Sequence, residues 1–300
     1  MKRESFGSRL GFILVSAGCA IGIGNVWKFP YICGAYGGAA FILIYLCFLV
    51  ILGIPVLVAE FAVGRGSHTS VAKCFDKLAP AGSCWKPLKF IGIIGCYMLM
   101  MFYTTVGGWM IYYCVKSLRG DFVGATPEAV TQSFSDMLGN APTMMLWMVI
   151  ICLIGFAVCF MGLQNGIEKI SKVMMSALLI IMVILAVHSV MMEGAGEGIS
   201  FYLIPDFQKI KEAGVGNVVF AALSQSFFTL SIGIGAMLIF GSYLDKSRSL
   251  TGEAVSITVL DTFVALTAGF IIIPACFSYG IQPDAGPSLI FITLPNIFAQ

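Results

Sequence analysis

Seven long apolar segments divide the chain, and they limit its fold more than any other feature of the sequence. A helix that crosses a bilayer needs roughly 20 mostly apolar residues, and each segment provides about that length. The segments cover residues 9–35, 38–64, 90–115, 143–161, 167–192, 216–242 and 254–280. Only 11% of the residues are charged, against about 25% in a typical soluble domain. The sequence therefore predicts an all-α, polytopic membrane protein embedded in the lipid bilayer.

The charged residues of the connecting loops predict which end of the chain is cytoplasmic. Basic residues gather at the N-terminus and in the loops after the second, fourth and sixth segments, at Lys2, Arg3, Arg9, Arg65, Lys73, Lys77, Lys86, Lys89, Lys169, Lys172, Lys246 and Arg248. The loops on the other side carry more acidic than basic residues. Because cytoplasmic loops are enriched in lysine and arginine, we expect a multi-pass protein of the inner (plasma) membrane with a cytoplasmic N-terminus.

The composition also argues against other classes of protein. The net charge is only +2 and there is no basic run, so nucleic acid is not an expected partner. A seven-helix receptor has an external N-terminus, which the loop charges contradict; a receptor or channel-like membrane protein is kept as the alternative hypothesis. We expect no enzyme, because the sequence has no metal-binding cluster and only two histidines.

The same tetrapeptide, Ile-Gly-Ile-Gly, interrupts the first and the sixth segments, at residues 21–24 and 232–235. Glycine destabilises a helix by about 1 kcal/mol relative to alanine. The first segment runs outward and the sixth runs inward, so the two copies have opposite directions. Glycine breaks at matching places in two inverted halves are typical of the binding site of a secondary transporter. The glycines could instead serve only close helix packing, but their recurrence in the inverted half favours the site.

The inverted repeat also predicts how the chain is divided. Residues 1–192 form the first five-helix repeat, and residues 193–215 form an extracellular connection. Residues 216–300 hold the first two helices of the second repeat and the start of the next extracellular loop. Because the first repeat extends about 170 residues beyond its break, we expect this chain to be part of a longer protein that continues after the seventh helix.

Two such breaks that face each other predict one site for a zwitterion and a small cation. A broken helix exposes one half-helix N-terminus, which attracts anions, and one C-terminus with free carbonyls, which attracts cations. In hydrocarbon such a break is tolerated only where protein or a cavity satisfies the freed groups. Asp261 lies in the middle of the seventh segment, and an ionisable residue there indicates a functional site.

Several motifs around the breaks resemble one known family. They are RLGFILVSAGCAIGIGNVWKFPY (9–31), GGAAFILIY (37–45), GIPVLVAEFAVGR (53–65), QSFFTLSIGIG (225–235) and SLIFITLPNIFAQ (288–300). Together they resemble the neurotransmitter:sodium symporter family, in its bacterial amino-acid transporter branch with the leucine-transporter fold. The resemblance implies a five-plus-five inverted-repeat fold with unwound first and sixth helices, here truncated after the seventh. It also implies sodium-coupled uptake of an amino acid by alternating access.

The resemblance further implies the substrate-binding residues. They are Ala20, Gly22, Ile23, Gly24, Leu99, Tyr103, Phe228, Thr229, Ser231 and Ile234. Family members that carry monoamines have an aspartate where this chain has Gly22, and the glycine leaves room for the carboxylate of an amino acid. The branch often has phenylalanine where this chain has Ile234, and the smaller side chain favours a hydrophobic or aromatic substrate. Which amino acid is carried is not predicted.

Two Na⁺ sites follow from the same resemblance. Site one would use Ala20, Asn25, Thr229 and Asp261 with the substrate carboxylate, and site two would use Gly18, Ile21 and residues of an eighth helix. Tyr45 and Gln225 match two positions of the chloride site in chloride-dependent members, but Ala265 replaces a serine there. We expect Asp261 to supply the negative charge itself, and transport to be independent of chloride.

Three residues match gating positions of the family, and two more lie near the expected partners. Arg3 and Phe6 match a cytoplasmic latch, with Tyr243 and Glu60 near its partners. Lys28 stands where the family usually has an arginine of the outer gate. Lysine offers a point charge in place of the two-pronged guanidinium of arginine, so a weaker outer salt bridge is expected. The oligomeric state is left open.

Overall fold

The computed structural model describes residues 6–280, 291–292 and 295, and these residues form helices joined by turns, with no strand among them. Five helices in this part of the chain are long and apolar enough to cross a membrane. They are Ala39–Ser67 (α3 Ala39–Phe48, η2 Leu49–Gly53 and α4 Ile54–Ser67), α6 Leu88–Arg119, α8 Ala141–Phe160, Leu163–Val190 (η3 Leu163–Glu168 and α9 Lys169–Val190) and α14 Leu250–Ser278. They confirm the second, third, fourth, fifth and seventh predicted segments, each within a few residues at its ends.

The first predicted segment is a broken span. Helix α1 (Arg9–Ala20) is followed by the π-helix η1 (Gly24–Lys28) and by α2 (Phe29–Ala35), and the two halves are bent by 55°. Ile21 has extended backbone angles, φ −69° and ψ 108°. The α-helical hydrogen bonds therefore stop within the first Ile-Gly-Ile-Gly, as the sequence predicts.

The sixth predicted segment is broken as well. Helix α12 (Val215–Thr229) is too short to cross a membrane by itself, and α13 (Ala236–Gly241) follows after a turn at residues 230–235. Gly233 and Gly235 have φ values of 94° and 79°, in the region that glycine occupies without steric cost. Gly235 is the N-cap of α13. The second tetrapeptide thus ends one half-helix and starts the next.

The two broken spans pack antiparallel. Helix α1, the first half of one span, contacts α13, the second half of the other. The π-helix η1, in the second half of its span, contacts α12. First halves therefore meet second halves, which is the arrangement that inverted repeats require.

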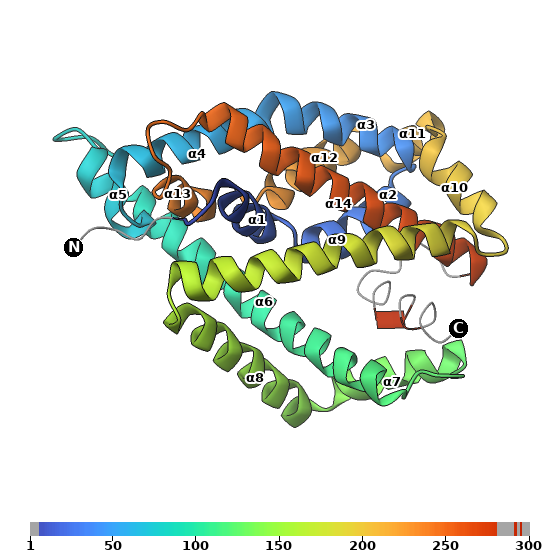
Figure 1. The fold of residues 1–300 in the computed structure, drawn as a ribbon. Coiled ribbons are helices and arrows are strands. Elements are labelled where there is room, and N and C mark those ends of the chain that lie inside the picture. The colour runs from blue at the N-terminus through green and yellow to red at the C-terminus, as the bar shows by residue number, and fades with distance from the viewer. Residues whose placement is uncertain (1–5, 281–290, 293–294, 296–300) are drawn as a thin grey trace.

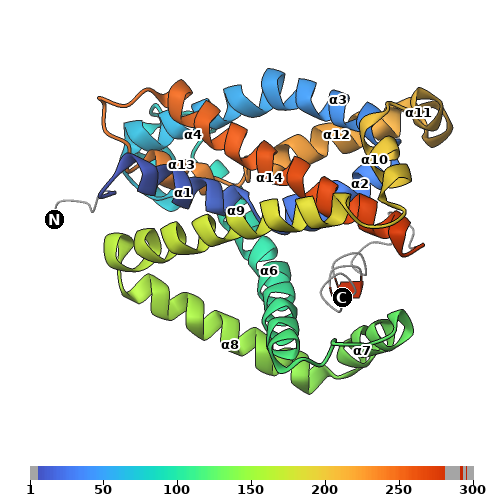
Figure 2. The same ribbon diagram turned by 45° about the vertical axis from the view of Figure 1, so that its right-hand side comes forward.

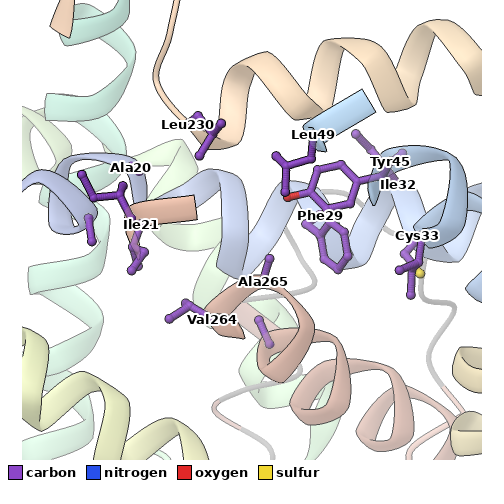
Figure 3. Close-up of a cluster of buried hydrophobic side chains, with 14 of the residues drawn as sticks. Ala20, Ile21, Phe29, Ile32, Cys33, Tyr45, Leu49, Leu230, Val264 and Ala265 are labelled. Carbon is purple, nitrogen blue, oxygen red and sulfur yellow. The ribbon is translucent and has the colours of Figure 1, made fainter. Parts of the chain in front are cut away.

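Helix α14 forms the centre of the bundle. It packs against α9, α10 (Ala195–Leu203), α1, α4, η1 and α2, and Figures 1 and 2 show it crossing between α3 and α9. Ala265 and Val264 of α14 are fully buried. In Figure 3 they lie in the same cluster as Tyr45 of α3, Phe29 of α2 and Leu230 of the second break. The seventh span therefore packs against residues of both broken spans.

Helices α6 and α8 pair with each other and extend away from this bundle (Figures 1 and 2). No residue of α8 is buried. Four short helices lie outside the predicted segments: α5 (Val71–Leu78), α7 (Pro127–Gly139), α10 and α11 (Phe207–Ala213). The last two fall within residues 193–215, so the predicted connection is largely helical.

Candidate functional site

Three buried polar side chains connect the two breaks to the seventh span. The Asn25 amide Nδ2, in η1, donates to Asp261 Oδ1 at 2.8 Å and to the Thr229 hydroxyl at 3.2 Å. The Thr229 hydroxyl, at the end of α12, donates to Asp261 Oδ2 at 2.8 Å. All three residues have no exposed surface. The structure thus brings together the three side chains that the sequence assigned to sodium site one.

The same network satisfies backbone groups that the first break leaves free. Asn25 Oδ1 accepts from the Gly22 amide at 3.2 Å, and Nδ2 also donates to the Asp261 carbonyl at 3.1 Å. Gln225 Nε2, one turn before Thr229 on α12, donates to the Gly24 carbonyl at 3.1 Å. Polar backbone groups inside a membrane protein need such partners. The break is therefore stabilised by side chains from the opposite broken span.

The second break is held from two sides. The Ser231 hydroxyl donates to the Cys19 carbonyl of α1 at 3.1 Å. Glu60 of α4 accepts from the amide of Gly233 at 2.6 Å and from that of Leu238 at 3.2 Å. A carboxylate at the N-terminus of α13 is favourable because free N–H groups point toward it. The sequence placed Glu60 near the cytoplasmic latch and missed that this carboxylate binds the turn of the second break; a role in the latch stays a prediction.

Asp261 is a buried carboxylate whose hydrogen bonds come from neutral groups. Within the described part of the chain, no lysine or arginine lies within 4.0 Å of it. A buried charge without an opposite charge is costly, and hydrogen bonds from Asn25 and Thr229 offset only part of this cost. The site therefore places the Asp261 carboxylate beside the Thr229 hydroxyl and the Asn25 side chain, groups whose oxygens can hold a small cation. In this structure Asn25 turns its amide nitrogen toward Asp261 and its oxygen toward the Gly22 amide.

A cavity of about 480 Å³ lies between α6 and the second broken span. Five predicted substrate residues line it: Leu99, Tyr103, Phe228, Ser231 and Ile234. The sequence missed its other lining residues, which are Gly95, Met98, Phe102, Ser224, Phe227 and Ile232. Gly95, Phe102 and Ser224 lie three or four positions from predicted residues, so helical spacing could have found them.

The two glycines of the first break differ in their surroundings. A Cβ at Gly24 would lie 2.8 Å from two ring carbons of Phe228, closer than carbon atoms can pack. A Cβ at Gly22 would lie 3.6 Å from the Tyr103 ring and 3.7 Å from its hydroxyl, an ordinary contact. Packing therefore requires glycine at residue 24, whereas the absence of a side chain at residue 22 leaves space that faces Tyr103.

Three of the predicted gating residues lie in the described part of the chain, and each of them contacts an aromatic ring. The rings of Phe6 and Tyr243 meet edge to face, with centroids 5.7 Å apart. Lys28 Nζ lies 4.0 Å from the centroid of the Phe228 ring, a cation–π contact. Arg3 lies outside the described residues. The structure thus brings together two aromatic residues predicted for the latch, and it places Lys28 against the Phe228 ring that lines the cavity; their roles as gates stay a prediction.

The remaining predicted residues belong to the first break and its flanks. Ala20 is the last residue of α1, and Ile21 and Ile23 flank Gly22 in the break. Gly18 faces α9, where its Cβ would lie 3.2 Å from Met175 Sδ. The assignment of carbonyl groups of this segment to substrate and Na⁺ stays a prediction.

Comparison with known proteins agrees with this geometry. The fold is similar to the crystal structure of MhsT in complex with L-phenylalanine, with a TM-score of 0.91 and 39% identity over 99% of this chain and 66% of that one. This places the chain among membrane transporters with two unwound helices. A family model described as the sodium:neurotransmitter symporter family matches residues 3–133 and 128–300, and the chain belongs to this family.

Two relatives at the sequence level are bacterial. An uncharacterized sodium-dependent transporter of Bacillus subtilis, YhdH, is 37% identical over 299 residues, which is 100% of this chain and 65% of the relative. An uncharacterized sodium-dependent transporter of Haemophilus influenzae is 34% identical over 308 residues, which is 100% of this chain and 66% of the relative. The chain thus spans about two thirds of the length of the relatives it matches.

Proposed function

We propose that the protein containing this chain is a symporter that couples the uptake of a hydrophobic or aromatic amino acid to the entry of Na⁺. The observation that carries the proposal is the buried Asp261, which is hydrogen-bonded to both broken spans and has no basic partner among the described residues. Such a carboxylate suits a cation that arrives together with the substrate. The sodium-dependent relatives support the same ion.

The substrate occupies the cavity beside the second break. Its carboxylate meets the amides of Ile23 and Gly24 and the Tyr103 hydroxyl, beside Gly22, which has no side chain to fill this place. Its amine meets the carbonyls of Ala20, Phe228 and Thr229 and the Ser231 hydroxyl. The side chain lies against the apolar wall formed by Leu99, Phe228 and Ile234. The volume of about 480 Å³ and the phenylalanine bound in MhsT favour a large apolar side chain.

Ion and substrate are coupled through a shared group. In site one, Na⁺ is held by the Ala20 carbonyl, Asn25, Thr229 and Asp261, and by the carboxylate of the bound amino acid. Each ligand then raises the affinity for the other by the same factor. Gly18 and Ile21 contribute to site two.

Alternating access moves the two broken spans relative to their surroundings, so that the site opens first outward and then inward. Because Asp261 already supplies a fixed negative charge, the cycle needs no chloride. The protein carries its substrate across the inner (plasma) membrane without chemical change. Its N-terminus faces the cytoplasm. The two halves correspond to residues 1–192 and to the repeat that begins at residue 216.

A thermal-shift screen of the full-length protein tests this proposal. Each of the twenty amino acids is added in buffer with Na⁺ and in buffer with choline at the same ionic strength. A bound ligand raises the apparent stability by mass action, so we expect large apolar amino acids to raise the melting temperature only with Na⁺. If no amino acid stabilises the protein in a sodium-dependent way, the proposal fails.

A further inference from the structure

Two buried carboxylates outside the substrate site hold the start of α1. Glu168, at the end of η3, contacts residues 7 and 8, and Glu253, in the first turn of α14, contacts residue 9. Both glutamates are 3% exposed. Three consecutive residues of the N-terminal segment are therefore bonded to two different spans.

Glu168 binds the segment that precedes α1. Its Oε2 accepts from the Gly7 amide at 2.8 Å, and its Oε1 accepts from the Ser8 hydroxyl at 3.2 Å and from Lys172 Nζ at 2.6 Å. The Ser8 hydroxyl also caps α1, because it accepts from the Gly11 amide at 3.0 Å. The helix cap and the attachment to the fifth span thus share one oxygen atom.

Glu253 binds the first residue of α1 itself. Its Oε1 accepts from Arg9 Nε at 3.0 Å, and Arg248 Nη1 lies 3.8 Å from the same oxygen. Arg65 Nη1 donates to the Arg248 carbonyl at 2.8 Å, so the loop before α14 is fixed as well. A hydrogen bond between charged groups is stronger than one between neutral groups. The seventh span therefore has a charged attachment to α1.

We propose that Glu168 and Glu253 are positioning residues that clamp the start of α1 and keep the inner half of the first broken span in its closed position. This inference rests on the proposed transport function, since α1 carries Gly18 and Ala20 to the ligand site. When α1 moves away, both carboxylates lose partners while they are still largely buried, which is costly. The clamp thus sets how often the inner half of the first span opens.

Gly11 supplies an independent way to disturb one side of the clamp. A Cβ at Gly11 would overlap the carboxylate of Glu168, so Gly11→Ala displaces that side chain. A Cβ at Gly7 would lie 3.6 Å from the same carboxylate oxygens, an ordinary contact, so Gly7→Ala is a matched control. Alanine favours a helix over glycine. Helix propensity alone therefore predicts that Gly11→Ala stabilises α1, whereas the clamp predicts that it loosens α1.

Hydrogen–deuterium exchange of the full-length protein, without Na⁺ or substrate, tests the clamp. We expect Glu168→Gln, Glu253→Gln and Gly11→Ala each to speed amide exchange in residues 9–20 about tenfold. Gly7→Ala and Glu128→Gln, which changes an exposed carboxylate of α7, are expected to leave it unchanged. Exchange in residues 257–278, beyond the turn of α14 that holds Glu253, reports global stability and is expected to stay constant.

A double-mutant cycle and a sodium titration separate positioning from a general loss of stability. If Arg9 and Glu253 act as one pair, the variant with both Arg9→Gln and Glu253→Gln exchanges no faster than the worse single variant. The Na⁺ concentration that protects residues 9–20 by half is expected to rise about tenfold in the glutamate variants, because less of the protein is competent to bind.

Two results would overturn the clamp. One is unchanged exchange in residues 9–20 in all three clamp variants. The other is an equal increase in residues 257–278, which would mean that the variants only destabilise the fold. Failure of the proposed function has a different signature: no amino acid then stabilises the wild-type protein with Na⁺, whereas the exchange measured without ligands still responds to the clamp variants.

Discussion

The side-chain amide of Asn25 donates to the carboxylate of Asp261 at 2.8 Å, across 236 residues of sequence. One residue belongs to the π-helical start of the outer half of the first span and the other to the middle of α14. This contact links the break to the helix at the centre of the bundle. Several predictions about ion and substrate binding depend on it.

Removal of the charge of Asp261 should weaken Na⁺ binding more than it weakens the fold. Asp261→Asn keeps an oxygen that can accept from Thr229 but has no negative charge. We expect the affinity for Na⁺ to fall by about 1.5–3 kcal/mol, roughly 10- to 100-fold. The measurement is the Na⁺ dependence of the melting temperature. Asp245→Asn, on an exposed loop residue, is the control, and equal sodium dependence in the two variants would contradict the role of Asp261.

The glycines of the first break should respond differently to alanine. Gly24→Ala forces a methyl group against the Phe228 ring, and such overpacking typically costs about 1–3 kcal/mol. Gly22→Ala adds a methyl group that the structure accommodates 3.6 Å from Tyr103. We expect Gly24→Ala to abolish amino-acid-dependent stabilisation and Gly22→Ala to retain most of it. Equal loss of this stabilisation in both variants would mean that the backbone conformation of the break requires glycine at both positions, whatever the space around them.

A carboxylate at residue 22 should change the class of ligand. Gly22→Asp places a negative charge in the space that faces Tyr103, where the substrate carboxylate is proposed to lie. The introduced carboxylate and the carboxylate of the substrate would repel each other, so amino acids should no longer stabilise the variant. Decarboxylated analogues, such as phenethylamine, should bind at least as well as phenylalanine. Retention of amino-acid binding in this variant would argue against the proposed position of the carboxylate.

The cavity wall at Ile234 should control the size of the substrate. Ile234→Phe fills part of the cavity of about 480 Å³, and one methylene group in an apolar pocket is worth about 1–3 kcal/mol of discrimination. We expect aromatic amino acids to lose stabilising effect and smaller aliphatic ones to keep it. The check is the same thermal-shift screen. A uniform loss for all substrates would instead indicate damage to the break.

Glu60 should stabilise the second break. Glu60→Ala removes the acceptor of the exposed Gly233 amide and of the Leu238 amide. Leu238 is buried, and an unsatisfied buried donor costs about 1–3 kcal/mol. Amide exchange should rise in residues 230–241 and stay unchanged in residues 9–20. Glu60→Gln keeps one acceptor oxygen and should give a smaller effect. Equal exchange in the wild type and in both variants would contradict the capping role.

The sequence predicted the spans and both breaks because hydrophobic length and glycine placement are local properties. The positions of Asn25, Thr229 and Asp261 came from motif resemblance, and the structure brought them together as expected. Helix α6 extends beyond its apolar segment at both ends, and α14 does so at its N-terminal end, because the polar residues there still continue the backbone hydrogen bonds. Hydropathy alone does not reveal this extension.

The misses have a different cause. The role of Glu60 depends on where the turn at residues 230–235 points its amides, and this direction is set by tertiary packing. The short helices α10 and α11 have no long apolar stretch, so nothing in their composition separates them from a loop. The contacts of Glu168 and Glu253 with residues 7–9 join distant parts of the sequence that carry no shared pattern.

The ring of Phe228 touches three functional parts at once. It lines the cavity, it lies against the backbone of Gly24, and it lies beneath the ammonium group of Lys28. A smaller residue here would enlarge the cavity, but it would also remove the packing against Gly24 and the cation–π contact with Lys28. In the proposed transporter, substrate preference at this wall is therefore tied to the position of Lys28, whereas a change at Leu99 or Ile234 leaves the contacts of Phe228 with Gly24 and Lys28 in place.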